Sequence, residues 1–268
     1  MVRLTDANGL PHPGALIQAV AAGGSVTPAT ATAHASGQAS LQWTPGTGSA
    51  NQLNLSLTAA PTVTLTLMAG SAVPVIEAVV NAASFGPGVA PGSLATPFGA
   101  HLATASVWLS GTDVRPFYSS DTQVNFYVPA ETPIGANVFA VRAPNGLQVS
   151  STISLVAVQP GIFSGAVVHA GTTVSALTTP VRAGDYIEIY CTGLGPTRLS
   201  GGLSPTTIQP TIYIGSTPVP AAFSGLAPGF VGLYQVDVQI PAGLPSGPLP
   251  LAISSGSTYS NTVNIAVQ

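Results

Sequence analysis

The side chains that could perform acid–base or metal chemistry are few and lie far apart in the chain. Metal and hydrolytic sites need such groups in clusters, and motifs such as H-E-x-x-H, G-x-S-x-G and the phosphate-binding P-loop do not occur here. We therefore expect no catalytic, cofactor-binding or metal-binding residues, and a protein that is not an enzyme. The carboxylates are Asp6, Glu77, Asp113, Asp121, Glu131, Asp185, Glu188 and Asp237, and the histidines are His12, His34, His101 and His169.

Two weaker alternatives stay open within this set of acids. Asp121, together with Glu131 or Asp113, could contribute to a structural calcium site, although Ca²⁺ takes about six to eight oxygen ligands and no Asp-rich linker is present. Two carboxylates could also converge in the folded chain as a glycosidase pair, but Asp185 and Glu188 would point to opposite faces of a strand.

Aromatic side chains offer a different chemistry, which is stacking against sugar rings. The candidates are Trp43, Trp108, Tyr118, Tyr127, Tyr213, Phe230 and Tyr234. We expect most of them to fill hydrophobic cores, with Trp43 in the first. The segment 224–235 is Gly-rich and is expected to expose Phe230 or Tyr234. A binding or assembly surface is therefore predicted at Trp108, Phe230 and Tyr234.

The composition restricts the class of partner. Charged residues make up 5% of the 268 positions, hydrophobic residues make up 46%, and lysine is absent. Five scattered arginines cannot form the basic stripe that neutralises phosphates, so we expect no nucleic-acid partner. The most apolar stretch, residues 65–80, is interrupted by Pro74 and Glu77, which predicts no membrane span.

A surface of Ser, Thr, Asn, Gln and Gly with so little charge predicts an extracellular or cell-surface location. Weak charge repulsion favours association with other copies of the chain or with other neutral surfaces. Cys191 is the only cysteine, so no intrachain disulfide can form. The N-terminus reaches a polar turn at Asp6 before any signal-peptide core, which is expected of a mature, trimmed or fragment chain.

Alternation of apolar and polar residues with period two dominates the elements. Leucines at 53, 55 and 57, apolar residues at 63, 65 and 67, and apolar residues at 187, 189 and 191 each alternate with polar neighbours, which predicts half-buried strands. Turn signals such as Asn8-Gly9 and Pro91-Gly92 separate the runs. The sequence therefore predicts an all-β protein.

An internal repeat divides the second part of the chain. Residues 122–159 align with residues 234–268, so that Gln123, Pro129 and Gly135 match Gln235, Pro241 and Gly247. Upstream, residues 91–103 match residues 183–195. A duplicated unit of this size is typical of immunoglobulin-like sandwiches and too long for a solenoid repeat. We predict three tandem immunoglobulin-like β-sandwich domains at 1–70, 71–160 and 161–268.

The N-terminal region resembles the bacterial Ig-like domain of group 1, the module of invasin- and intimin-type adhesins. The resemblance rests on the Asp6-Ala7-Asn8-Gly9 turn, Pro13-Gly14, Gly23-Gly24-Ser25-Val26, Ser36-Gly37-Gln38-Ala39 and the Trp43-Thr44-Pro45-Gly46 corner. It implies a further strand before residue 2, so either the domain is cut or another chain supplies that strand by β-augmentation.

Residues 74–268 resemble a C-terminal domain family of unknown function found on secreted proteins of Solibacter-type acidobacteria, with halves similar to IPT/TIG domains. The matching segments are VVNAASF (79–85), PGSLATPFGAHLA (91–103), QVNFYVPAETPIG (123–135), PGIF (160–163) and GLAPGFVGLYQVDVQIP (225–241). The resemblance implies fold and secretion, and brings no active site.

These observations predict a non-enzymatic extracellular structural or adhesive protein. It would be a subunit of a self-assembling surface fibre (a filament), or an adhesin stalk, with other copies of itself as partners. The alternative is a carbohydrate- or surface-binding module of a larger secreted protein, with polysaccharide or cell-surface glycan as its partner.

Overall fold

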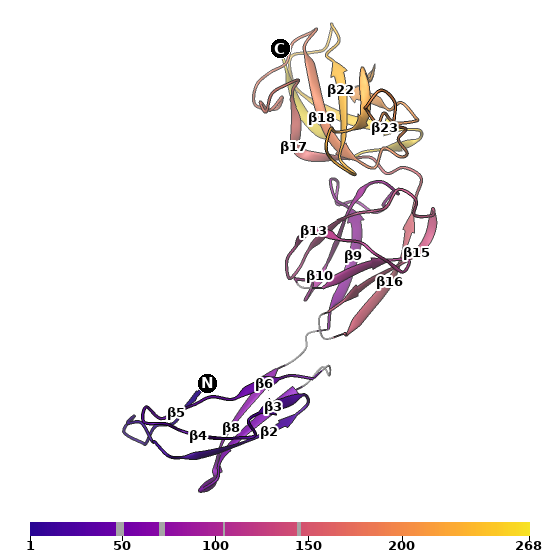
Figure 1. Ribbon diagram of the computed structural model, residues 1–268. Helices are drawn as coiled ribbons and strands as arrows, with labels where there is room; N and C mark the ends of the chain where they lie inside the picture. Colours follow the sequence, from indigo (N-terminus) through magenta and orange to yellow (C-terminus); the bar gives the residue numbers. More distant parts are fainter. Residues whose placement is uncertain (47–50, 70–72, 104, 144–145) are drawn as a thin grey trace. The chain divides into compact units, whose positions relative to one another are not determined.

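The computed structural model describes residues 1–46, 51–69, 73–103, 105–143 and 146–268. They form two compact units, the first made of Met1–Val73 with Pro144–Leu147 and the second of Pro74–Ala143 with Gln148–Gln268 (Figure 1). The described residues contain strands, turns and loops but no helix, and so no helix that could cross a membrane. The predicted fold class, all-β with tandem immunoglobulin-like sandwiches, is confirmed. The predicted domain boundaries remain predictions.

The first unit is a sandwich with one complete layer. Its four-stranded sheet has the order β4-β2-β7-β8, and its other layer consists of the two short pairs β1-β5 and β3-β6. The strands are β1 (Val2–Arg3), β2 (Leu16–Ala22), β3 (Ser25–Thr27), β4 (Thr30–Thr32), β5 (Gln38–Ala39), β6 (Gln42–Thr44), β7 (Asn51–Leu57) and β8 (Ala60–Ala69).

The second unit contains two sandwiches with the same strand order. In the first of them, one sheet has the order β13-β14-β10-β9 and the other β12-β11-β15-β16. This is the arrangement of an immunoglobulin-like domain, in which strands A, B, E and D form one sheet and strands C, F and G form the other; β12 is an additional strand at the edge beside β11. The strands are β9 (Val75–Asn81), β10 (Leu94–Ala100), β11 (Ser106–Leu109), β12 (Thr112–Asp113), β13 (Pro116–Ser119), β14 (Val124–Tyr127), β15 (Gly135–Arg142) and β16 (Gln148–Leu155).

The C-terminal sandwich repeats this order strand by strand. Its sheets are β17-β18-β22-β21 and β20-β19-β23, with β24 and β25 both paired to β23. Figure 1 shows β17, β18 and β22 as neighbours in one layer. The strands are β17 (Gly161–His169), β18 (Tyr186–Thr192), β19 (Thr211–Ile214), β20 (Thr217–Pro220), β21 (Phe223–Leu226), β22 (Tyr234–Gln239), β23 (Gly247–Ser255), β24 (Thr258–Tyr259) and β25 (Val263–Val267).

Alternation determines which side chains form the cores of the two sandwiches in the second unit. Ile187, Ile189 and Cys191 of β18 are fully buried, while the residues between them are partly exposed. Such alternation places every second side chain against the facing sheet. The C-terminal core contains nineteen buried apolar residues and the core of the preceding sandwich thirteen, with Phe126 stacked on Phe139 at 5.6 Å between ring centroids.

The first unit has a much smaller core. Its five buried apolar residues are Ile17, Ala19, Ala39, Leu53 and Leu55, two of which are alanines. The predicted strand over 62–67 exists as β8, but the prediction that it is half-buried is wrong, because all residues from Pro61 to Met68 are exposed. Burial of a strand requires a facing layer, and the layer that faces this sheet consists only of the short pairs β1-β5 and β3-β6.

Candidate functional site

A joint between the two sandwiches of the second unit is centred on Tyr234. This residue begins β22, where it is paired with Cys191 of β18, and its side chain is 2% exposed. The Tyr234 hydroxyl donates to the carbonyl oxygen of Gly195 at 2.6 Å and lies 3.3 Å from the carbonyl oxygen of Gly92 in the preceding sandwich. Of the two residues that segment 224–235 is expected to expose, Phe230 is exposed, whereas Tyr234 is buried because its side chain turns inward to the joint.

Thr192 and Asn81 add further polar contacts to the joint. The Thr192 hydroxyl donates to the carbonyl oxygen of Gly232 at 2.6 Å and accepts from the backbone N–H of Leu94 at 2.9 Å. The Asn81 side-chain amide donates to the carbonyl oxygen of Gln159 at 2.8 Å. No buried side-chain nitrogen or oxygen in the described part of the chain lacks a partner. The joint is therefore a satisfied polar network, which fixes one geometry.

Two glycines allow the backbones to approach each other closely at the joint. Gly193 has a φ of +78°, and a Cβ atom there would overlap the carbonyl oxygen of Gln159. A Cβ atom at Gly232, where φ is +72°, would lie 2.7 Å from Leu94 and 2.9 Å from Tyr127. Only glycine combines these positive φ values with such close contacts.

An open cleft of about 410 Å³ lies beside the joint. Its lining is mainly apolar, and includes the ring of Tyr127 and the exposed side chains of Ile134 and Ile208. Burial raises the pKa of the Tyr127 hydroxyl, and the charge of Glu131 raises it further. Burial likewise raises the pKa of Tyr234 above its usual range. Both phenols are therefore neutral at physiological pH and serve as hydrogen-bonding groups rather than as acids or bases.

The other two predicted surface residues lie in different sandwiches. Trp108 is half-buried in β11, where its indole N–H donates to the Ser106 hydroxyl at 3.3 Å. Phe230 lies in the loop before β22 and is 60% exposed, next to Val231 at 64%. Phe230 and Val231 form an apolar loop tip, whereas Tyr234, three residues after Val231, is buried.

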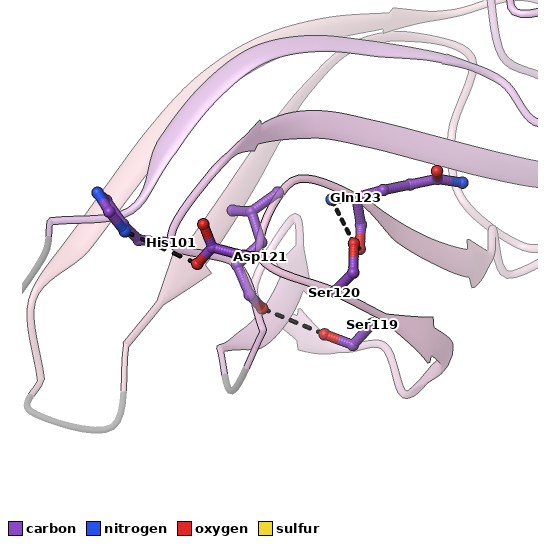
Figure 2. Close-up of polar contacts among 6 residues, drawn as sticks. His101, Ser119, Ser120, Asp121 and Gln123 are labelled. Carbon is purple, nitrogen blue, oxygen red and sulfur yellow. Dashed lines mark hydrogen bonds and ion pairs between the residues drawn. The ribbon is translucent and has the colours of Figure 1, made fainter.

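The predicted calcium ligands are not gathered into one group. Asp121 lies in the loop before β14, and Glu131 follows the other end of that strand, while Asp113 belongs to β12 in the other sheet. Figure 2 shows the surroundings of Asp121, whose Oδ1 lies 3.7 Å from Nδ1 of His101. Within the described residues, no three His, Cys, Asp or Glu side chains are grouped in a way that could hold a metal ion.

The structure pairs two acids that the sequence did not bring together. Glu188 of β18 lies directly opposite Asp237 of β22. Tyr190 donates to Oε2 of Glu188 at 3.0 Å, and the Gln235 amide donates to Oδ1 of Asp237 at 2.9 Å. Burial raises the pKa of Asp237, the Gln235 hydrogen bond lowers it, and the charge of Glu188 raises it. The cross-strand register, which depends on the fold, was needed to find this pair.

Comparison with known proteins shows similarity of fold to solved structures but assigns the chain to no family. No family model matches the chain, and no curated protein matches it in sequence. The resemblances to the group 1 Ig-like domain and to the acidobacterial C-terminal family therefore remain predictions, whereas the immunoglobulin-like fold is observed.

Several solved structures are similar to the chain at low identity. They include SGBP-B of the Bacteroides ovatus mixed-linkage glucan utilization locus in complex with a mixed-linkage heptasaccharide (10% identity, TM-score 0.36, 94% of this chain and 60% of that one). Invasin, a bacterial integrin-binding protein, has 11% identity and a TM-score of 0.23, with 99% of this chain and 55% of that one covered. The I9–I11 tandem of titin has 9% identity and a TM-score of 0.27, with 85% and 77% covered. The chain spans 60% and 49% of the first two structures that it matches.

Proposed function

We propose that this chain is a non-enzymatic structural or adhesive protein of the cell exterior, acting as a subunit of a self-assembling surface fibre or as an adhesin stalk. The observation that supports the proposal best is the joint at Tyr234. Most contacts between domains of one chain allow relative motion unless they are large and hydrophobic. Here the contact of the Tyr234 hydroxyl with Gly92, the hydrogen bond from the Leu94 N–H to Thr192 and close approaches at two glycines connect the sandwiches, which is what a stalk that transmits force requires.

The scarcity of charge supports the same proposal. Between Ala7 and Ile76 the chain contains no Asp, Glu, Lys or Arg. Surfaces without like charges approach each other without electrostatic repulsion, which favours assembly outside the cell.

Negative-stain electron microscopy of the purified chain, together with its mass in solution, tests the proposal. We expect filaments, or stiff rods that associate as the concentration rises. Compact dispersed monomers in which the two sandwiches of the second unit change their relative orientation from particle to particle would contradict both the fibre and the stalk.

A carbohydrate- or surface-binding module is the second candidate, and the exposed loop tip at Phe230 favours it. Aromatic rings that project from loops are the groups that stack on sugars. A glycan array with the unmodified chain tests this candidate, using Phe230→Ala and Trp108→Ala as variants. Loss of sugar binding in either variant with unchanged assembly would favour this second function. An array without any bound glycan would leave the structural proposal as the better one.

A further inference from the structure

The outer edge of β8 in the first unit is open, whereas the corresponding edge is covered in both sandwiches of the second unit. All three sandwiches have one sheet of the same order, in which β8 corresponds to β16 and β25. A segment before the second strand pairs in parallel with the last strand in the two later sandwiches, through Val89 with Leu155 and Val181 with Val267. Among the described residues, β8 pairs only with β7.

The inner face of β8 is apolar and lacks a cover. Leu65 and Leu67 lie opposite the buried Leu55 and Leu53 of β7, so they share the core face of the sheet. Even so, Val63 is 56% exposed, Leu65 47% and Leu67 40%. A groove of about 270 Å³ runs along this face; its lining includes the apolar Leu4, Ile17, Val63 and Leu65, and also Arg3.

This edge lacks several of the features by which proteins protect exposed edge strands. Short length, charged side chains and bulges that twist the edge away normally prevent pairing with another chain. β8 is ten residues long and carries no charged side chain, and its proline, Pro61, lies at its very start. Its irregularity lies at the hairpin end, at Leu57, away from the apolar stripe. The edge is therefore suited to accept a strand.

We infer that the occupant of this edge is β8 of a second copy of the chain, paired antiparallel. This inference rests on the proposed structural function and names its partner. A strand that pairs antiparallel with its own copy has its twofold axis normal to the sheet, so the two apolar stripes lie side by side on the same face. In a register centred on Leu65, Val63 faces Leu67 of the second copy, and Thr64 faces Thr66.

Self-complementarity is what selects a second copy over another occupant. Apolar pairs and Thr–Thr pairs directly opposite each other are favourable in antiparallel sheets, and like charges are unfavourable. The β8 sequence supplies only the favourable kinds of pair around Leu65, and the charged residue that lines the groove, Arg3, belongs to β1 rather than to the paired edge. Pairing joins the two four-stranded sheets into one sheet. The apolar residues of β8 in the two copies then form one continuous surface on the same face.

Sedimentation of the full chain over a concentration series tests the inference, with matched leucine variants. Leu65→Lys places two ammonium groups opposite each other at the centre of the pair, so we expect the dissociation constant of the dimer to rise at least about tenfold. Leu16→Lys is the control, because Leu16 is 41% exposed but lies on β2, which has a neighbour on each side. We expect this control to dimerise like the unmodified chain.

Disulfide trapping gives an independent measurement in case Leu65→Lys disturbs folding of the first unit. The only native cysteine, Cys191, is fully buried and does not interfere. We expect Leu65→Cys to form covalent dimers under mild oxidation, and Leu16→Cys to form none.

Three results would overturn the inference: a monomer at every concentration, dimers that persist unchanged in Leu65→Lys, or equal trapping of the two cysteine variants. A monomer would assign the edge to a strand from outside this chain. Fibres that still form in Leu65→Lys would retain the proposed function and refute only this surface. If the chain forms dimers that Leu65→Lys weakens, but its sandwiches change their relative orientation, the β8 surface is retained and the stalk function is refuted.

Discussion

Replacing Tyr234 with phenylalanine should weaken the joint while leaving the core packing unchanged. The ring remains in place, and only a buried hydroxyl is removed, together with its 2.6 Å bond to Gly195 and its contact with Gly92. A hydrogen bond contributes about 0.5–1.5 kcal/mol net, and a buried carbonyl left without that partner costs about 1–3 kcal/mol. We expect the free energy of unfolding of the second unit to fall by about 1–3 kcal/mol.

The two tryptophans provide an assay that separates the sandwiches. Trp43 belongs to the first unit and Trp108 to the first sandwich of the second unit, while the C-terminal sandwich contains no tryptophan. In a Trp43→Phe background, urea unfolding followed by fluorescence therefore reports on Trp108 alone. Since Tyr234 lies in the other sandwich, a shift of the Trp108 midpoint in Tyr234→Phe measures coupling through the joint.

Tyr186→Phe is the matched control for this experiment. Tyr186 lies in the same sandwich, at the start of β18, and is 46% exposed. Removal of an exposed hydroxyl should change stability by less than about 0.5 kcal/mol. The same urea midpoint for Trp108 fluorescence in the two variants would mean that the sandwiches unfold independently. In that case the reasoning that makes the joint a rigid connection is refuted.

Three further predictions concern the second unit. Gly193→Ala should destabilise the joint by at least about 2 kcal/mol more than Gly165→Ala, because both glycines have positive φ but only Gly193 meets a backbone carbonyl; equal losses in thermal unfolding would contradict this. The raised pKa of Asp237 means that the folded state binds a proton more tightly than the unfolded state, so stability falls as pH rises through the range just above the usual Asp pKa. Asp237→Asn should therefore raise Tm at neutral pH and remove that part of the pH dependence of Tm; a Tm at neutral pH below that of the unmodified chain would contradict this. Burial raises the pKa of the Cys191 thiol well above its usual range, so a thiol reagent should label it only in denaturant, and rapid labelling of the folded chain would show that the core opens.

The strand pattern of this protein could be predicted from local sequence, since alternation is a local property. The runs at 53–57 and 186–191 are β7 and β18; the predicted side chains are buried except for that of Leu57, which is partly buried. The aligned segments around Gln123 and Gln235 also lead into strands β14 and β22, which occupy the same position in sheets of equal order.

Whether one face of a strand is buried, by contrast, depends on other parts of the molecule. Alternation shows that Val63, Leu65 and Leu67 share a face, but whether that face is buried depends on whether a strand lies above it. Tyr234 appeared exposed because its loop is rich in glycine. The same glycines allow the backbone to approach the neighbouring sandwich, and this draws the ring inward. The pair Glu188 and Asp237, 49 residues apart in the sequence (237 − 188), likewise required the register between β18 and β22.

The joint at Tyr234 also shows how duplicated modules come to differ. In the aligned copies, Thr122 occupies the position of Tyr234, and His101 occupies that of Gly193. The preceding copy thus has neither the long hydroxyl-bearing ring nor the bare backbone that the joint requires, and its corresponding end carries the exposed His101 and Asp121 pair. The two copies therefore differ at the aligned positions that build the joint, so the fold of one copy alone does not determine whether it can form these contacts.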